Sequence, residues 1–209
     1  MSEEIALKIL IIGDNSAGKT QLMSNYVDGY FPSPHVATIG SYYKIKKIQY
    51  KDIEINLHIW NLIEMERFHA IPKSYLKCSD GIILLYDITK RNSFYFVKDI
   101  ISLNDFEFTE FNVKKILVGN SLDLDVNSFD LEKERQVFRE SVQKFCEKRN
   151  IKEIEVSSKL GTNVSECFEL LVESIIENQT KEELLKKYGK KNKEGEDIKL
   201  SQLDKYISF

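Results

Sequence analysis

A chain of 209 residues with 42% apolar content is long enough to bury one substantial core and short for two full domains. Thirty basic and 33 acidic residues leave a net charge of -3, which removes the bulk attraction that general nucleic-acid binding needs. The three cysteines, Cys78, Cys146 and Cys167, are widely spaced in apolar patterns and fit neither a disulfide framework nor a metal site. We expect them to be reduced and mostly buried, and we expect no nucleic-acid partner.

The two ends of the chain carry few targeting signals. The sequence contains no run of about 18 or more apolar residues, the length that would be needed to span a bilayer. Residues 1–4 lack the basic residues of a signal peptide and the second-position glycine that myristoylation requires. We therefore expect a cytoplasmic protein. After Thr180 the composition turns to Lys, Glu and Gly, which predicts a domain over 1–180 and a flexible charged tail over 181–209 that could contain one helical turn.

Strand patterns open the chain. Residues 5–12 form a nearly continuous apolar run, which is typical of a strand covered on both faces of a parallel sheet. A helical pattern follows over 21–28, and the ranges 41–50 and 52–60 predict an antiparallel hairpin because apolar and polar residues alternate in the second of them.

Further strands and helices alternate along the rest of the chain. We expect strands over 81–86, 115–119 and 153–156, and helices over 93–103, 131–149 and 163–178. This alternation predicts an α/β layer fold with right-handed crossovers. The predicted architecture is Rossmann-like, with about six mostly parallel strands and five flanking helices.

A phosphate-binding loop is predicted between the first strand and the first helix. Residues Gly13 to Thr20 match G-x-x-x-x-G-K-[ST], and the two glycines allow backbone N-H groups to approach a β-phosphate. In this pattern Lys19 bridges the β- and γ-phosphates as the main electrostatic stabiliser, and the Thr20 hydroxyl holds Mg²⁺. The other residues predicted to contact the nucleotide here are Asn15, Ser16, Ala17, Gly18 and Gln21. A chance match arises in roughly one chain in a hundred of this length, but the position between strand and helix favours binding.

The order of motifs after this loop resembles the Rab branch of the small GTPases, from about Leu7 to Asn178. The motifs that carry the resemblance are Thr38-Ile39-Gly40, Ile59-Trp60, Glu66-Arg67-Phe68, Leu85 to Thr89, and Ser93-Phe94. The resemblance implies a P-loop G domain that binds GTP or GDP with Mg²⁺ and switches in vesicle trafficking. It further implies that Thr38 ligates Mg²⁺ and senses the γ-phosphate, and that Phe31 lies against the guanine ring.

The same resemblance implies that two later segments, 120–123 and 157–159, select guanine. Asn120 to Asp123 resembles the family's N-K-x-D, with Ser121 in place of Lys. The Asp123 carboxylate can accept from guanine N1-H and its exocyclic amine, which adenine does not present together. Ser157-Ser158-Lys159 resembles S-A-K, so the Ser158 N-H would meet guanine O6 and Lys159 would pack near the ring. An ordinary Asn/Asp turn is the alternative for the first segment.

Switch II departs from the family's W-D-T-A-G-Q-E. Asn61 lacks the charge that holds Mg²⁺ through water, Glu64 replaces a glycine whose N-H reaches the γ-phosphate, and Met65 replaces the catalytic water-orienting glutamine. We therefore expect slow GTP hydrolysis. A pseudo-GTPase that does not switch on hydrolysis is the alternative. The apolar side chains of Leu62, Ile63 and Met65 predict either packing under a helix or a protein-binding surface.

Partner contacts are also inferred from the resemblance. Tyr43, Trp60 and Tyr75 occupy positions where Rab proteins present an aromatic effector patch, although core packing is an alternative. We expect effectors and regulators to bind there and at the switch regions of a monomer. No cysteine follows Cys167, and the basic cluster 186–193 is followed by acidic residues, so any membrane contact should be weak or indirect.

Overall fold

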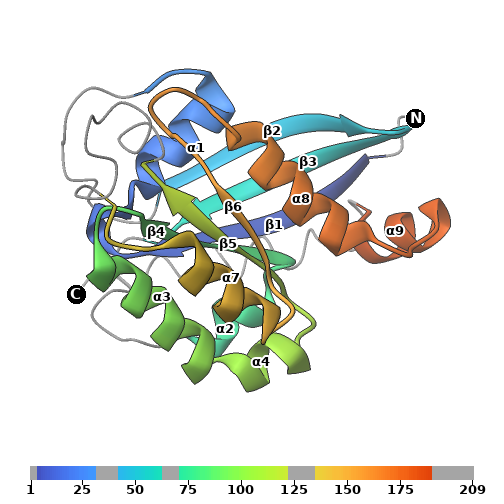
Figure 1. The fold of residues 1–209 in the computed structure, drawn as a ribbon. Coiled ribbons are helices and arrows are strands. Elements are labelled where there is room, and N and C mark those ends of the chain that lie inside the picture. Colours follow the sequence, from blue (N-terminus) through green and yellow to red (C-terminus); the bar gives the residue numbers. More distant parts are fainter. Residues whose placement is uncertain (1–3, 32–41, 63–70, 122–134, 190–209) are drawn as a thin grey trace, which may run out of the picture.

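The first apolar run forms the central strand of the sheet. In the computed structural model, which describes residues 4–31, 42–62, 71–121 and 135–189, β1 (Glu4–Gly13) pairs in parallel with β3 on one side and β4 on the other. The other strands are β2 (Tyr42–Tyr50), β3 (Ile53–Asn61), β4 (Gly81–Asp87), β5 (Lys114–Asn120) and β6 (Lys152–Glu155). Their order is β2-β3-β1-β4-β5-β6, and only β2 is antiparallel to its neighbour (Figure 1).

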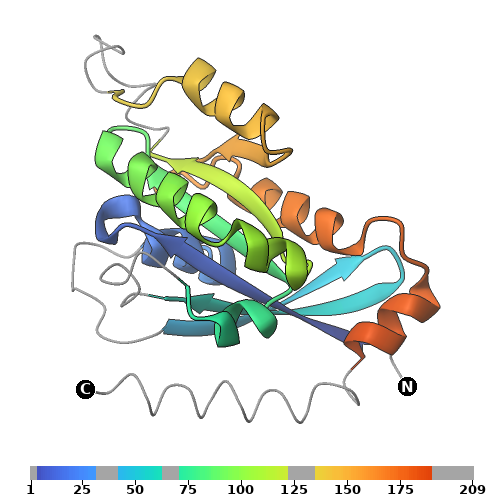
Figure 2. The same ribbon diagram turned by 90° about the horizontal axis from the view of Figure 1, so that it is seen from below.

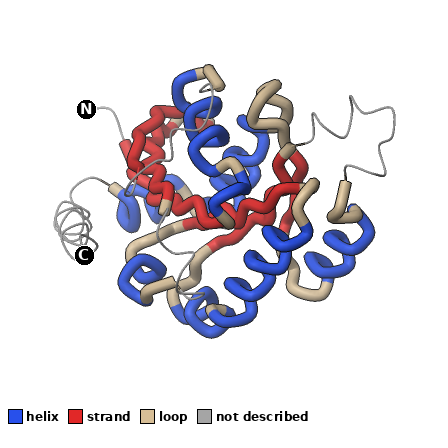
Figure 3. The backbone as a smooth tube through the Cα atoms, turned by 90° about the vertical axis from the view of Figure 1, so that its left-hand side faces the viewer, coloured by secondary structure: helices blue, strands red, loops and turns tan. Residues whose placement is uncertain are grey.

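Helices cover both faces of this sheet. They are α1 (Lys19–Asp28), α2 (Lys73–Lys77), α3 (Arg91–Leu103), α4 (Asp105–Glu110), α7 (Arg139–Glu147), α8 (Val164–Ile176) and α9 (Lys181–Tyr188). The core cluster on one face contains side chains of α1, α8 and α9, and the cluster on the other contains side chains of α2, α3, α4 and α7. Figures 2 and 3 show helices on both faces of the sheet.

The alternation of side chains along β1 explains its continuous apolar pattern. Ile9 and Ile11 belong to the first cluster, whereas Leu10 and Ile12 belong to the second. Successive side chains of a strand point to opposite faces, so a strand covered on both faces needs apolar residues at every position. The prediction of a strand covered on both faces, in a mostly parallel α/β sheet of about six strands, is therefore confirmed.

The expected number of helices was too low. The described residues contain seven α-helices where about five were expected, and α2, α4 and α9 match none of the four ranges that were predicted as helices. The helix predicted over 131–149 begins only at Arg139 in the described part, because the N-H groups of Gln136 and Val137 donate to the Ile88 carbonyl instead (both 2.9 Å).

Helix α9 continues regular structure past Thr180. The Thr180 side chain accepts from the Glu183 N-H, and the Glu183 carboxylate accepts from the Thr180 N-H, which completes a capping box. Leu184 and Tyr188 are buried in the core cluster, and Gly189 forms an antiparallel bridge with Ile5. The composition predicted a flexible tail from 181 that could contain one helical turn, and the structure has an eight-residue helix packed on the domain there. Residues 190–209 lie outside the described part.

Two further expectations concern burial and membranes. Cys146 and Cys167 are buried and Cys78 is half-buried, as expected. Within the described ranges, no helix is both long enough and apolar enough to cross a bilayer.

Candidate nucleotide-binding site

The predicted site residues follow the carboxyl ends of parallel strands. The site includes the end of β1 at Gly13, the end of β3 at Asn61 and the end of β5 at Asn120, and Ser157 follows just after β6. The strand register places Ile11 beside Asn61, so these ends lie at one edge of the sheet. In open α/β sheets, ligands bind in the crevice at this edge.

The two glycines of the phosphate loop are required by close backbone approach. A Cβ at Gly13 would lie 2.2 Å from the Leu85 carbonyl oxygen. Gly18 has a φ of 89°, and a Cβ there would lie 2.3 Å from Nδ2 of Asn120. Larger side chains at either position would displace backbone or the Asn120 amide, so the loop is confined to its tight course.

Lys19 places a buried positive charge inside this loop. Its Nζ donates to the carbonyl oxygens of Gly13 (2.8 Å) and Asp14 (3.0 Å), and the side chain is 5% exposed. A phosphate bound to the loop would therefore meet an ammonium group whose position is already fixed, which is the role predicted for Lys19.

Asp14 within the loop and Lys90 outside it both help to hold the loop in shape. The Asp14 carboxylate accepts from the N-H (2.8 Å) and the hydroxyl (2.6 Å) of Ser16, which lies with Asn15 and Ala17 in a 3₁₀ turn. Partial burial raises the pKa of Asp14, but these hydrogen bonds and the nearby lysines lower it by more, so the net pKa lies below its usual value. Lys90 donates to the Ser16 carbonyl (3.4 Å), a contact that sequence reasoning missed because the two residues are far apart in the chain.

Asn61 and Thr20 meet where the resemblance places the metal. Nδ2 of Asn61 donates to Oγ1 of Thr20 (3.0 Å), and Asn61 is fully buried. Among the described residues its Oδ1 has no hydrogen-bond partner. A buried acceptor beside a hydroxyl suits a hard cation such as Mg²⁺, which prefers oxygen ligands. Both groups are neutral, however, so the attraction for the ion is weaker than with a carboxylate.

Asn120 joins the phosphate loop to the loop after β6. Its Nδ2 donates to the Ala17 carbonyl (2.9 Å), and its Oδ1 accepts from the N-H (3.0 Å) and the hydroxyl (2.9 Å) of Ser158. Asn25 donates to the Ser158 carbonyl (3.1 Å) and fixes the same loop from α1. Asn120 was predicted to recognise the base and the Ser158 N-H to meet guanine O6; both roles stay predictions, and in the structure the Ser158 N-H donates to Oδ1 of Asn120. Asn25 was missed because a lone Asn in a helix carries no signal.

Several predicted site residues are not tested by these contacts. Thr38, Glu64, Met65 and Asp123 lie outside the described residues, so their roles stay predictions. Three other predicted site residues are described by the structure, but their roles stay predictions. Gln21 lies in the first turn of α1, and Phe31 and Lys159 are exposed.

Of the three residues in the predicted aromatic patch, Tyr43 is exposed, Trp60 is half-buried and Tyr75 is buried. Tyr43 on β2 packs against Trp60 on β3 with ring centroids 4.4 Å apart, and its hydroxyl is 2.6 Å from Nδ1 of His58. Tyr75 is 5% exposed and belongs to the core, and Leu62 is buried there too. Tyr75 therefore offers almost no surface for a partner, because α2 turns it toward the sheet. Ile63 lies outside the described part.

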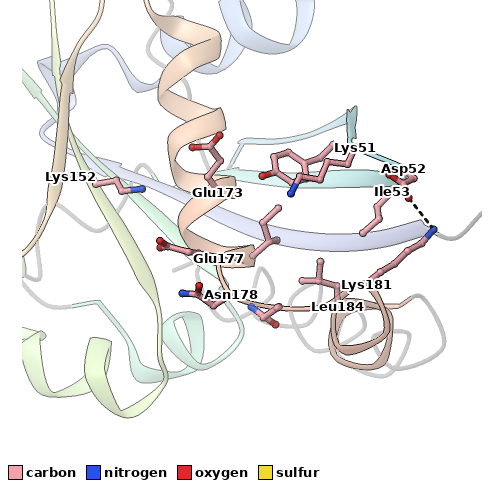
Figure 4. Close-up of a pocket in the computed structure, with 12 residues that line it drawn as sticks. Lys51, Asp52, Ile53, Lys152, Glu173, Glu177, Asn178, Lys181 and Leu184 are labelled. Carbon is pink, nitrogen blue, oxygen red and sulfur yellow. Dashed lines mark ion pairs between the residues drawn. The ribbon is translucent and has the colours of Figure 1, made fainter.

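A cavity of about 460 Å³ lies at the opposite edge of the sheet (Figure 4). It is bounded by the β2–β3 turn, the end of α8 and the start of α9, where Lys181 and Asp52 approach to 3.9 Å. Its lining carries both lysines and carboxylates, which favours no ligand class. This cavity is separate from the phosphate loop.

Fold and site together define a P-loop nucleotide-binding protein of the α/β class, and sequence comparisons identify its family. The Ras family model matches residues 8–177, so the chain belongs to the Ras family, as a Rab-like small GTPase. The chain is 33% identical to Ras-related protein Rab-15 of Homo sapiens over 86% of this chain and 81% of that protein. It is 41% identical to Ras-related protein Rab-1D of Dictyostelium discoideum, over 77% of this chain and 75% of the relative. It is 34% identical to GTP-binding protein YPTM2 of Zea mays, over 80% and 79% respectively.

Proposed function

We propose that this chain binds GDP and GTP with Mg²⁺ on the loop Gly13 to Thr20 and acts as a slow switch in vesicle trafficking at endomembranes. The observation that carries the proposal is the Asn120 side chain, which ties the phosphate loop to Ser158 in the loop after β6. A single amide thus sets the spacing between the phosphate cradle and the proposed guanine loop.

Binding rests on residues that are present. Lys19 would stabilise charge on the β- and γ-phosphates, and Thr20 with Thr38 would hold Mg²⁺, which would neutralise part of the phosphate charge. Asp123 would read guanine, and Phe31 with Lys159 would cover its ring.

Hydrolysis depends on residues that are altered. Met65 has no group that can orient a water molecule for attack. If the Glu64 carboxylate lies about 5 Å from a γ-phosphate and does not turn outward, it would repel the phosphate by roughly 3 kcal/mol per unit charge at an effective dielectric of about 20. Asn61 holds Thr20 through a neutral amide. We infer that the chain binds GTP better than it cleaves it, and that a bound state lasts until a partner acts.

A pseudo-GTPase is the second candidate, favoured by the buried amide of Asn61 in place of a carboxylate. Chromatography of nucleotide extracted from the purified full chain separates the two. Bound GDP or GTP, with GTP converted slowly in a single turnover, supports the switch. Absence of nucleotide, with partner binding unaffected by GTP, supports the pseudo-GTPase.

A restored centre tests the reason given for slow hydrolysis. The triple variant Asn61→Asp, Glu64→Gly and Met65→Gln should hydrolyse GTP at least about tenfold faster than the parent. The same variant with Lys19→Ala serves as the inactive control. A triple variant no faster than the parent would show that the altered switch is not what limits hydrolysis.

A further inference from the structure

A groove lies between helices α3 and α7, on the face of the sheet opposite α1 and α8. Figures 1 and 2 show the two helices side by side. The hollow has a volume of about 240 Å³. Its lining includes Arg91, Phe94, Tyr95, Lys98, Val137 and Phe138. None of these residues belongs to the proposed nucleotide site.

The groove is held in shape by contacts beneath it. The Gln136 and Val137 N-H groups both donate to the Ile88 carbonyl, and the Arg91 N-H donates to Oε1 of Gln136 (3.2 Å). Phe94 on α3 meets Phe145 on α7 edge to face, with centroids 5.9 Å apart. Because these contacts fix the floor and join the walls, a ligand would bind with little ordering of the protein.

Two aromatic rings stand exposed at the rim. Tyr95 and Phe138 are each 48% exposed, although both carry enough apolar surface to be buried in a core. Exposed aromatic rings beside a hollow are typical of the anchors that dominate protein-protein interfaces. Their position suits an apolar side chain of a partner inserted between them.

The charges of the groove have one sign. Arg91 and Lys98 are the charged residues of its lining, and within the described residues neither forms an ion pair. The Lys98 ammonium instead lies 5.3 to 5.7 Å from the ring centroids of Tyr95, Phe94 and Phe145. Arg139, by contrast, binds Glu155 at 2.9 Å. These two cations of the described lining favour an acidic ligand.

We propose that the groove binds an acidic segment of a partner protein through an apolar anchor. The anchor inserts between Tyr95 and Phe138, and flanking carboxylates pair with Arg91 and Lys98. The groove shares no residue with the phosphate loop, so the segment would bind without contacting the nucleotide. This separates the groove from a nucleotide-sensing surface.

The test starts from a random dodecapeptide library displayed on phage and selected on the full chain. The enriched peptides should be rich in Asp and Glu and contain Trp, Phe or Leu. Fluorescence polarisation with the synthetic peptides then compares two groove variants with the parent. Affinity should fall about tenfold or more both in Arg91→Glu/Lys98→Glu and in Tyr95→Ala/Phe138→Ala.

Matched variants keep the test specific. Lys77→Glu/Lys148→Glu makes the same change of charge at exposed sites elsewhere, and Leu103→Ala/Phe106→Ala removes exposed apolar groups outside the groove. Both should bind the peptides as the parent does. Failure to enrich acidic peptides, or equal binding by the groove variants, would overturn the proposal. The proposal would also be overturned if a labelled single-stranded oligonucleotide bound more tightly than the peptides and the same variants abolished its binding.

Discussion

Asn120 shows how one side chain can position two loops. Its amide nitrogen donates to the Ala17 carbonyl, and its amide oxygen accepts from the Ser158 hydroxyl. Removing the side chain would therefore leave these buried groups without their partners. Asn120→Ala should lower the free energy of unfolding by about 1–3 kcal/mol and weaken GDP binding by about tenfold or more. Urea unfolding and GDP titration measure the two effects. Exposed Asn92→Ala is the matched control, and an Asn120→Ala protein with unchanged GDP affinity would remove the positioning role.

Asn61 determines how strongly Mg²⁺ can contribute. A carboxylate at this buried position adds a negative charge beside the Thr20 hydroxyl, so Asn61→Asp should raise Mg²⁺ affinity of the GDP-bound chain by about tenfold. The rate of release of a fluorescent GDP analogue, followed during Mg²⁺ titration, gives that affinity. Asn61→Ala should leave Mg²⁺ affinity no higher than in the parent. Equal Mg²⁺ affinity in Asn61→Asp and the parent would contradict this account.

The cysteines should differ sharply in reactivity. Burial raises the pKa of Cys146 from an ordinary 9.0 to about 12, and burial also raises the pKa of Cys167. Because their folded pKa values exceed the unfolded values, these thiols contribute stability below about pH 9 that is lost as the pH rises from there.

At pH 8 a thiol reagent should label Cys78 quickly and the other two cysteines only on unfolding. Mass spectrometry of the labelled chain, with Cys78→Ser as the control, checks this; rapid labelling of Cys167 would contradict it.

Among the helices, α9 packs on the domain near the start of β1. Leu184 and Tyr188 reach the core that α1 and α8 share, and Gly189 pairs with β1. Leu184→Ala should lower the free energy of unfolding by about 2–5 kcal/mol, or less if α9 detaches locally. Hydrogen exchange of the amides in 181–188 should accelerate in this variant and stay unchanged in the exposed Glu182→Ala. Unchanged exchange in Leu184→Ala would show that α9 is not held by this contact.

Elements with strong periodicity were predicted well, and short ones were not. The strands were predicted because each carries an apolar run or a clear alternation, as in the hairpin of β2 and β3. Helices α2 and α4 span five and six residues, too few for a periodic pattern to emerge. The start of α7 was misplaced because Val137 continues the apolar pattern but pairs with Ile88 instead.

At the scale of the whole molecule, the site combines local and distant information. The phosphate loop could be predicted because its residues are consecutive, and the fold places it as expected between β1 and α1. The contacts of Asn25 and Lys90 and the burial of Tyr75 could not, because they arise when segments far apart in sequence meet. The family assignment agrees with the order of motifs, while the altered switch II sets this chain apart within that pattern.

We propose that the loop Gly13 to Thr20 holds a diphosphate while the chain selects guanine. Isothermal titration calorimetry of the nucleotide-stripped full chain with Mg²⁺ tests it most directly, using GDP, GTP, ADP and ATP in parallel. We predict binding of GDP and GTP that is at least about a hundredfold tighter than that of the adenine nucleotides, and its loss in Lys19→Ala. Equal affinity for guanine and adenine nucleotides, or no binding of either, would contradict the account.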